Sequence, residues 1–309
     1  MGDRGSARAT DAPLSRRFPQ PSALVELLKP ITWFAPMWAL GCGVVSAAVP
    51  LWENAGVILA TVLLAGPLVC GTSQAVNDWF DRHVDAINEP NRPIPSGRVP
   101  GRWGLYVALV WTGVALVVAG FLGVWVFGAA VFGLALAWMY SAPPFRLKRN
   151  GWWGNAAVGL CYEGLPWFTG AAALSTVEPD GRIVALALLY SLGAHGIMVL
   201  NDFKALEGDQ KTGVRSIPVQ LGVPGAVRLA CSVMALPQLV VTALLFAWGQ
   251  PVHGGIVAAL LGLQLILMTQ LAQNPRDRAA WYNATGTTLY VLGMLVSAFA
   301  IRGVLMKGL

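Results

Sequence analysis

Two acid-rich segments of the sequence have the residue types and the spacing that a divalent-cation site requires. The first contains Asn77, Asp78, Asp81 and Asp85. A helix, at about 100° per residue, would place these four side chains on one face about 100° wide. Carboxylates crowded on one face repel one another, whereas Mg²⁺ prefers oxygen ligands and usually keeps waters and substrate phosphates beside one or two carboxylates. The segment therefore predicts a magnesium site, with helix capping or solvated loop charge as the structural alternative.

The second segment, residues 201–209, reads N-D-F-K-A-L-E-G-D and repeats the Asn-Asp pair and the final Asp of the first at the same spacing. Ala205 stands where the first segment has Asp81, and Glu207 is additional. Gly208 is expected to break the helix, which would let Glu207 turn inward. The predicted metal ligands here are Asp202, Glu207 and Asp209, and the sequence leaves open which of the last two binds. If the two segments face each other, they would suit two Mg²⁺ ions that bridge a diphosphate.

Basic residues near the two segments are candidates for binding the remaining diphosphate oxygens through charge-assisted hydrogen bonds. They are Arg92, Lys148, Lys204, Lys211 and Arg215. A cytoplasmic loop of a membrane protein also collects basic residues, which explains each of them equally well. The carboxylates expected to act in catalysis are Asp78, Asp81, Asp202 and Asp209.

The elements that position these residues are predicted to be transmembrane helices. The chain has 309 residues, of which 56% are hydrophobic and only 12% charged, whereas a soluble domain carries about 25% charged residues. Runs of about 20 apolar residues are long enough to cross a bilayer. We predict an all-α polytopic membrane protein with nine spans around a central cavity. The predicted spans are 31–49, 55–75, 104–121, 124–140, 153–173, 182–200, 224–246, 252–271 and 283–301.

The distribution of Lys and Arg predicts the orientation of these spans. With nine spans, eighteen of the 21 basic residues fall on the side of the N-terminus, and basic residues accumulate in cytoplasmic loops. The N-terminus and both acidic segments are therefore expected on the cytoplasmic side, and the C-terminus on the opposite side. The net charge of +6 is then explained by topology, and no nucleic-acid partner is expected.

The predicted domain organisation is simple. Residues 1–29 form a polar, flexible cytoplasmic segment without the apolar core of a signal peptide, and residues 30–309 form the nine-helix domain. The four cysteines lie in apolar runs without a C-x-x-C pair, which favours helix packing over disulfides or metal binding. They are Cys42, Cys70, Cys161 and Cys231.

The pattern N-D-x-x-D-x-x-x-D after the second span, with an Asp-rich segment after the sixth, resembles the UbiA superfamily of intramembrane prenyltransferases. Residues 85–97, 140–155 and 201–219 look like the chlorophyll and bacteriochlorophyll synthase branch, and Y-E-G-L-P-W at 162–167 favours the bacteriochlorophyll enzyme. The resemblance covers nearly all of the chain after about residue 25. It implies a photosynthetic inner membrane, Mg²⁺, and the transfer of a C20 prenyl group, geranylgeranyl or phytyl, from its diphosphate to the propionate carboxyl of bacteriochlorophyllide.

The resemblance also implies roles for individual residues. Asn77, Asp78, Asp81 and Asp85 match the first Mg²⁺–diphosphate motif of the family, and Asp202 and Asp209 match the second. Tyr140 and Ser141 match positions near the substrate pocket. Two ionisable residues lie within predicted spans, where such residues are functional candidates. Both are predicted to line the substrate pocket. Glu163 could orient the tetrapyrrole or pair with a basic residue, and His195 could ligate the macrocycle's Mg, hydrogen-bond a carbonyl or serve in helix packing.

The chemistry implied by the resemblance needs no strong general base, because a propionate is already ionised at neutral pH. A membrane cavity that excludes water would protect the allylic cation left when diphosphate departs. The alternatives are a chlorophyll synthase that uses chlorophyllide, a quinone- or haem-type prenyltransferase, and a tetrapyrrole transporter whose acids form an ion pathway. Prenyl diphosphate, the tetrapyrrole acceptor and the bilayer are the expected partners, and any pigment-assembly protein is left unidentified.

Overall fold

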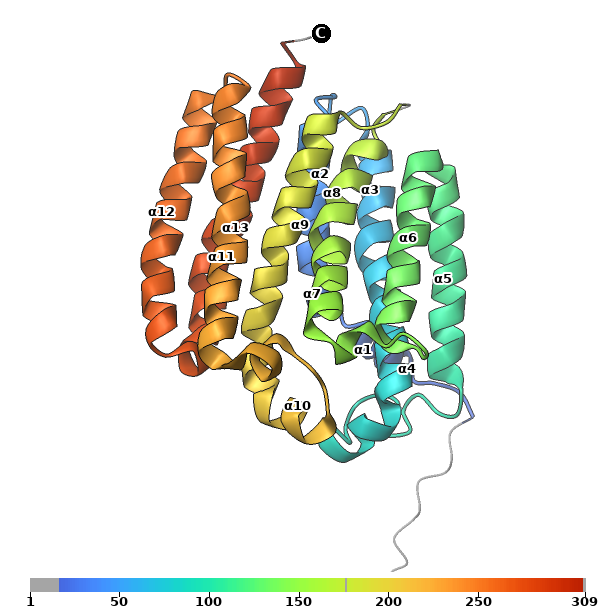
Figure 1. Ribbon diagram of the computed structural model, residues 1–309. Helices are drawn as coiled ribbons and strands as arrows, with labels where there is room; N and C mark the ends of the chain where they lie inside the picture. The colour runs from blue at the N-terminus through green and yellow to red at the C-terminus, as the bar shows by residue number, and fades with distance from the viewer. Residues whose placement is uncertain (1–16, 176, 308–309) are drawn as a thin grey trace, which may run out of the picture.

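The computed structural model describes residues 17–175 and 177–307, and within them the helices form nine rods side by side (Figure 1). The rods are, in chain order, η1–α2 (Pro30–Trp33, Phe34–Ser46), α3–η2–α4 (Ala55–Leu63, Leu64–Cys70, Gly71–Asn88), α5 (Trp103–Phe121), α6 (Val124–Ser141), α7–η4–α8 (Gly151–Gly159, Leu160–Gly164, Leu165–Ala172), α9 (Gly181–Asp202), α11 (Ile217–Ala247), α12 (Pro251–Gln273) and α13 (Pro275–Leu305). The short elements are α1 (Pro21–Leu27), η3 (Leu147–Arg149), η5 (Phe203–Ala205) and α10 (Leu206–Thr212).

The prediction of an all-helical membrane protein with nine spans is confirmed within the described residues. Seven of the rods are long and apolar enough to cross a bilayer by themselves. The other two are α2, which has only 13 residues, and the interrupted rod α7–η4–α8. Some boundaries differ from those predicted, because α4 continues to Asn88 and α13 already begins at Pro275. Polar residues extend these helices into the interface, where hydropathy gives no signal.

Two rods contain a π-helical segment at mid-length, and each segment lies at a proline. Pro67 is inside η2, and Pro166 follows η4 within the first turn of α8. Proline has no N–H to donate to the carbonyl four residues earlier, and its ring clashes with that carbonyl. The helix accommodates this with a wider turn, which changes the direction of nearby side chains. η2 and η4 both lie in the wall of the cavity described below.

Helix α9 lies at the centre of the bundle, with α11, α12 and α13 on one side and the remaining rods on the other (Figure 1). Small residues permit close approach of helix backbones in membranes. A Cβ atom added to Gly196 of α9 would lie 2.6 Å from the carbonyl oxygen of Ala230 in α11. One added to Gly159 of α7 would lie 2.6 Å from that of Ser191 in α9. These contacts fix α9 as the wall shared by both halves of the bundle.

The described part of the N-terminal segment is folded. In α1, Ala23 and Leu27 are fully buried in a cluster with Ala75 and Val76 of α4 and Val107 of α5. Helix α1 thereby packs against α4 and α5, and the chain reaches the first rod already in contact with the bundle. The flexibility predicted for the beginning of the chain concerns residues 1–16, which lie outside the described residues. The division at residue 29 stays a prediction.

Candidate functional site

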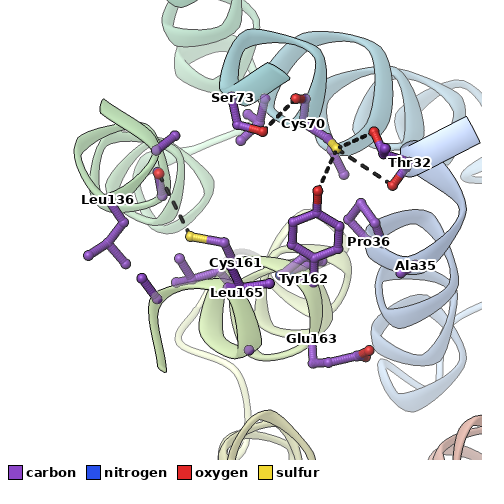
Figure 2. Close-up of a pocket in the computed structure, with 18 of the residues that line it drawn as sticks. Thr32, Ala35, Pro36, Cys70, Ser73, Leu136, Cys161, Tyr162, Glu163 and Leu165 are labelled. Carbon is purple, nitrogen blue, oxygen red and sulfur yellow. Dashed lines mark hydrogen bonds between the residues drawn. The ribbon is translucent and has the colours of Figure 1, made fainter. Parts of the chain in front are cut away.

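A cavity of about 580 Å³ lies within the part of the bundle that precedes α11, with α9 as one of its walls. Its walls come from η1–α2, η2–α4, α6, α7–η4–α8 and α9, and the exposed wall is mostly apolar. Figure 2 shows part of this wall, where η4 faces η2 and η1–α2. The polar and thiol-bearing residues in the wall are Thr32, Cys70, Ser73, Gln74, Asn77, Tyr140, Cys161, Tyr162, Glu163, Thr169 and Asn201. The cavity has the size and lining of a site for a long apolar ligand with a few fixed polar contacts.

Both acidic segments begin at this cavity. Asn77 of α4 and Asn201 of α9 lie in its wall, and each is held by a side-chain hydrogen bond. The Asn77 Nδ2 donates to Ser141 Oγ over 3.1 Å, and the Asn201 Oδ1 accepts from Asn283 Nδ2 over 2.9 Å. The aspartates that follow the two asparagines therefore lie at the edge of the cavity, Asp78 within α4 and Asp202 at the end of α9.

The carboxylates of the first segment are paired with basic side chains. Lys29 Nζ donates to Asp78 Oδ1 over 2.7 Å, and Arg92 contacts both Asp78, at 3.5 Å, and Asp85, at 2.9 Å. Lys148 Nζ lies 2.6 and 2.5 Å from the two oxygens of Asp81. Three basic side chains thus neutralise three carboxylates on one helix face, as the crowding of like charges requires.

Asp78 is the most buried of these acids, with 1% of its surface exposed. Its Oδ1 is paired with Lys29, but its Oδ2 is buried without a hydrogen-bond partner. A buried carboxylate oxygen without a partner is costly unless a ligand completes it. An unpartnered carboxylate oxygen beside Asn77, at the edge of a large cavity, is an expected feature of a cation site.

The second segment has a different environment. The Asp202 Oδ2 accepts from Asn155 Nδ2 over 3.1 Å, and among the described residues no basic side chain forms an ion pair with it. Glu207 is exposed and Asp209 is half-buried in α10. The two acidic segments therefore differ in charge balance, since only the first is neutralised by its neighbours.

The predicted helical register of the second segment is wrong after Asp202. Helix α9 ends there, and the backbone passes through the 3₁₀ turn η5 into α10. Gly208 lies inside α10 and does not break it. The Asn-Asp pair repeats the first segment, but Asp209 does not share a continuous helical face with Asp202 as Asp85 does with Asp78.

The end of α6, the linker that follows it and the start of α7 connect the two acidic segments. Ser141 and Lys148 bond to the first segment, and Asn155 bonds to the second. Tyr140 lines the cavity between them, within electrostatic reach of both Asp202 and Asp81. Burial lowers the pKa of Lys148 from its ordinary value, and the hydrogen bond to Asp81 opposes that shift.

Of the five basic residues predicted to bind diphosphate, the structure brings two to the first segment. Arg92 and Lys148 contact its carboxylates. Lys204, Lys211 and Arg215 are exposed, and the described residues contain no ion pair between them and the acids. The backbone of Arg215 instead pairs with the linker, because its N–H donates to the Arg149 carbonyl over 2.9 Å.

Two site residues were not predicted from the sequence. Lys29 is one of the basic residues on the predicted cytoplasmic side, and it bonds to Asp78, which is 49 positions away. It adopts a left-handed backbone conformation with φ of 46°, which is rare for a residue other than glycine. Asn155 bonds to Asp202 across 47 positions. No local spacing signals either pairing, although Asn155 ends the 140–155 stretch that carried the family resemblance.

The two ionisable residues within the spans have different positions. Glu163 lies in the cavity wall with only 5% of its surface exposed, and its Oε2 has no partner. His195 was predicted to line the pocket, but the structure does not place it in the wall. Its neighbours Ala194 and Ile197 face the cavity, whereas the His195 ring lies against Trp152, with 6.0 Å between ring centroids. One residue along a helix turns a side chain by about 100°, which accounts for the difference.

The edge of the cavity at Asp78 and Asp202, which we call the mouth, has side chains of the type that binds Mg²⁺. Aspartate and asparagine oxygens are the hard ligands that Mg²⁺ prefers, and Asp78 has an uncommitted oxygen. The described residues contain no preassembled group of three or more His, Cys, Asp or Glu, because the acids face basic partners instead. Mg²⁺ that keeps waters and phosphate oxygens as ligands needs only one or two carboxylates. Asp78 and Asp202, each beside an asparagine in the wall, are the best placed.

Comparisons with known proteins agree with this geometry. The UbiA prenyltransferase family matches residues 32–300 of the chain. The chain is 61% identical over 288 residues to the bacteriochlorophyll synthase 33 kDa chain of Cereibacter sphaeroides, covering 93% of this chain and 95% of that one. It is 39% identical over 289 residues to the chloroplastic chlorophyll synthase of Oryza sativa, covering 89% and 76%. A solved UbiA homologue from Archaeoglobus fulgidus, bound to DMAPP and Mg²⁺, shares the fold with a TM-score of 0.70 at 17% identity, covering 91% and 99%.

Proposed function

The chain belongs to the UbiA prenyltransferase family, and we propose that it transfers a C20 prenyl group from its diphosphate to the propionate carboxyl of bacteriochlorophyllide, releasing diphosphate. The 61% identity to a bacteriochlorophyll synthase, against 39% to a plant chlorophyll synthase, supports bacteriochlorophyllide over chlorophyllide. The observation that carries the proposal is the apolar cavity whose mouth holds the two Asn-Asp pairs. The apolar interior of the cavity suits the prenyl chain, and its charged mouth suits the diphosphate.

The residues of the mouth hold the diphosphate of the donor. Asp78 and Asp202 are the proposed Mg²⁺ ligands, with Asp81, Asp85 and Asp209 nearby, and we propose one ion per segment. Bound Mg²⁺ would neutralise the diphosphate and stabilise the charge that develops on it. Arg92 and Lys148 already lie beside the first segment, so their N–H groups can move from carboxylate to phosphate oxygens without a large displacement.

The cavity wall excludes water and positions the two substrates. It buries the prenyl chain, for which transfer from water is worth about 0.8 kcal/mol per CH₂ group. The acceptor propionate is ionised near neutral pH, so the wall needs no strong base to activate it. Excluding water prevents hydrolysis of the allylic cation. Positioning the carboxylate beside the C–O bond that breaks supplies the remaining rate enhancement.

Lys29 is predicted to compete with Mg²⁺ for Asp78. Its ammonium occupies the neighbourhood that a metal ion would enter, 2.7 Å from Asp78 Oδ1. The substitution Lys29→Met keeps the length of the side chain and removes its charge. Because a partly exposed ion pair is worth about 1 kcal/mol, we expect Mg²⁺ to bind about 5-fold more tightly. Calorimetric titration of the detergent-solubilised variant with Mg²⁺ measures this. Arg276→Met, which removes an exposed charge in α13, is the control, and an unchanged affinity in Lys29→Met would contradict the prediction.

Glu163 is predicted to bind the acceptor rather than the donor. Its carboxyl is buried in the wall, and among the described residues it has no ion-pair partner. Glu163→Gln preserves the shape of the side chain but replaces one carboxyl oxygen by an NH₂ group. We expect the KM for the acceptor to rise about 10-fold, as for a lost hydrogen bond to a buried group, with the KM for the prenyl diphosphate nearly unchanged. Steady-state kinetics with each substrate varied in turn test this, with the exposed Glu53→Gln as control. An unaltered acceptor KM would count against it.

The chain is an integral membrane protein by its fold and family. We propose a photosynthetic inner membrane and a cytoplasmic mouth, supported by the basic loops around the two acidic segments. α13 ends at the face of the bundle opposite α4 and α10 (Figure 1). Its C-terminal end is accordingly proposed on the far side of the membrane.

A panel of acceptors tests the proposed function. Purified protein with Mg²⁺ and geranylgeranyl diphosphate is presented in parallel with bacteriochlorophyllide, chlorophyllide, haem, 4-hydroxybenzoate and homogentisate, and released diphosphate is measured. Bacteriochlorophyllide should give the highest kcat/KM. A preference for a phenol or haem would move the chain to another branch of the family. Mg²⁺-dependent binding without any diphosphate release would favour a transporter.

A further inference from the structure

The hydroxyl of Tyr162 has an uncommitted proton in the cavity wall. Its oxygen accepts a hydrogen bond from Gln74 Nε2 over 3.1 Å, and Cys70 Sγ lies 3.6 Å from both this oxygen and the Thr32 carbonyl oxygen. Figure 2 shows the ring extending from η4 toward Cys70 and Thr32 across the wall. A hydroxyl has two lone pairs and one proton. Gln74 engages one lone pair, and no oxygen or nitrogen among the described residues accepts the O–H, which leaves it to donate to a ligand.

The donors around this hydroxyl are themselves fixed. Thr32 Oγ1 donates to the Lys29 carbonyl over 2.8 Å, and it lies 3.4 Å from Cys70 Sγ. Donors that point at a hydroxyl oxygen polarise its O–H and strengthen the bond that it donates. The cluster of Thr32, Cys70, Gln74 and Tyr162, which we name the tyrosine cluster, comes from three separate rods. It therefore fixes one donor direction in a mostly apolar wall.

The tyrosine cluster lies just inside the charged mouth. Gln74 precedes Asp78 by four positions on the same face of α4, a separation of about 6 Å. The diphosphate held at Asp78 would place the first prenyl carbon toward the cavity, and the attacking oxygen must lie about 3–3.5 Å from that carbon. The Tyr162 hydroxyl is thus at the depth where the acceptor carboxylate, and not the diphosphate or the distal prenyl chain, is expected.

The interruption of the helix at η4 explains how Tyr162 reaches this position. Cys161, Tyr162 and Glu163 are consecutive, and all three lie in the cavity wall. Three consecutive residues of a regular α-helix span about 200°, so a straight helix could not aim them at one cavity as readily. The π-helical turn before Pro166 provides the change of direction.

We propose that Tyr162 binds the acceptor by donating its O–H to one oxygen of the propionate carboxylate while the other oxygen attacks the prenyl group. This inference rests on the proposed function. A neutral donor suits this role, because a lysine or arginine at the same place would hold the carboxylate in an ion pair and reduce its nucleophilicity. No proton is transferred in this step. The carboxylate forms the new C–O bond, and the diphosphate leaves with the electron pair of the bond that breaks.

The test compares two ligands in two proteins. The ligands are bacteriochlorophyllide and an analogue in which a propyl group replaces the propionate side chain, and fluorescence titration gives the Kd of each. Tyr162→Phe removes only the hydroxyl. We expect it to weaken acid binding about 10-fold and to change analogue binding less than about 2-fold, with the KM for the prenyl diphosphate unchanged. Tyr282→Phe is the matched control, because the Tyr282 hydroxyl is buried without a partner, outside the cavity wall.

The outcomes separate the inference from its premise. Equal weakening of both ligands by Tyr162→Phe would place the hydroxyl against the macrocycle, and no weakening would remove it from the acceptor site; either result overturns the inference. Wild-type protein that binds the acid but releases no diphosphate refutes the proposed function and not the binding contact. If Tyr162→Phe does not fold, Gln74→Leu replaces it. This variant removes one donor to the Tyr162 oxygen and is expected to weaken the acid selectively, by about 3-fold.

Discussion

Asp78→Asn is expected to lower kcat by at least about 100-fold, the scale observed when one electrostatic contact to a developing anion is removed. Asn has the shape of Asp but no charge, so it cannot hold a divalent cation with comparable strength. The buried Oδ2 of Asp78 has no protein partner, and a ligand of the reaction is the group available to complete it. The same loss is expected for Asp78→Ala.

Folding has to be measured beside activity, because Asp78 also neutralises Lys29 and Arg92. Removing one partner of a partly buried ion pair leaves the others unpaired and destabilises the protein. The thermal unfolding midpoint in detergent and the Mg²⁺ affinity of Asp78→Asn are therefore recorded together with kcat. Asp277→Asn, an exposed acid in the first turn of α13, should change neither quantity. Activity near that of the wild type in a folded Asp78→Asn would remove Asp78 from the metal site.

The first acidic segment could be predicted from the sequence because all of its information is local. Asn77, Asp78, Asp81 and Asp85 lie on one uninterrupted helix, α4, so a period of 3.6 residues is enough to align them. The nine rods were predictable for a similar reason, since hydropathy and loop charge are both read within short windows. Neither signal depends on which helix packs against which.

The second segment could not be predicted in the same way. The chain leaves the α-helix at Phe203, although residues 203–205 are F-K-A and contain no proline or glycine to signal an end. Gly208, the residue that does carry such a signal, is helical. Packing of Phe203, which is 4% exposed, against neighbouring helices overrides the local preference, and a single sequence does not contain that packing.

The pairings that complete the site were also hidden from the sequence. Lys29 with Asp78 and Asn155 with Asp202 join residues from different rods, and only the arrangement of rods brings them together. Lys29 and Asn155 nevertheless give the two acidic segments different charge environments. We expect the first segment to exchange the Lys29 ammonium for a metal ion when Mg²⁺ binds. The second segment starts from an aspartate held by an amide and without a counter-ion among the described residues.

This difference predicts how much each acid of the second segment contributes to kcat. Asp202→Asn is expected to reduce kcat by at least about 100-fold, because Asp202 follows a cavity-lining residue and Asn155 already fixes its carboxylate. Asp209, half-buried one helix further on, lies within electrostatic reach of Asp202. Asp209→Asn should therefore cost less, about 5-fold, as for a charge that acts through a more solvated space. Glu207→Gln, at an exposed position, should stay within about 2-fold of wild type.

The three variants are informative as a ranked set, because each replaces one carboxylate by its amide within eight positions of the same chain. Mg²⁺ titration of each variant distinguishes a ligand of the metal from a residue that contributes only to the electrostatic field at the site. A ligand variant should need more Mg²⁺ at half-saturation and should remain slow at saturating Mg²⁺, whereas a field residue should recover as Mg²⁺ rises. If Glu207→Gln proves slower than Asp202→Asn, the chain beyond η5 must fold over the cavity when substrate binds. In that case the metal site of the second segment is formed by α10 and not by the end of α9.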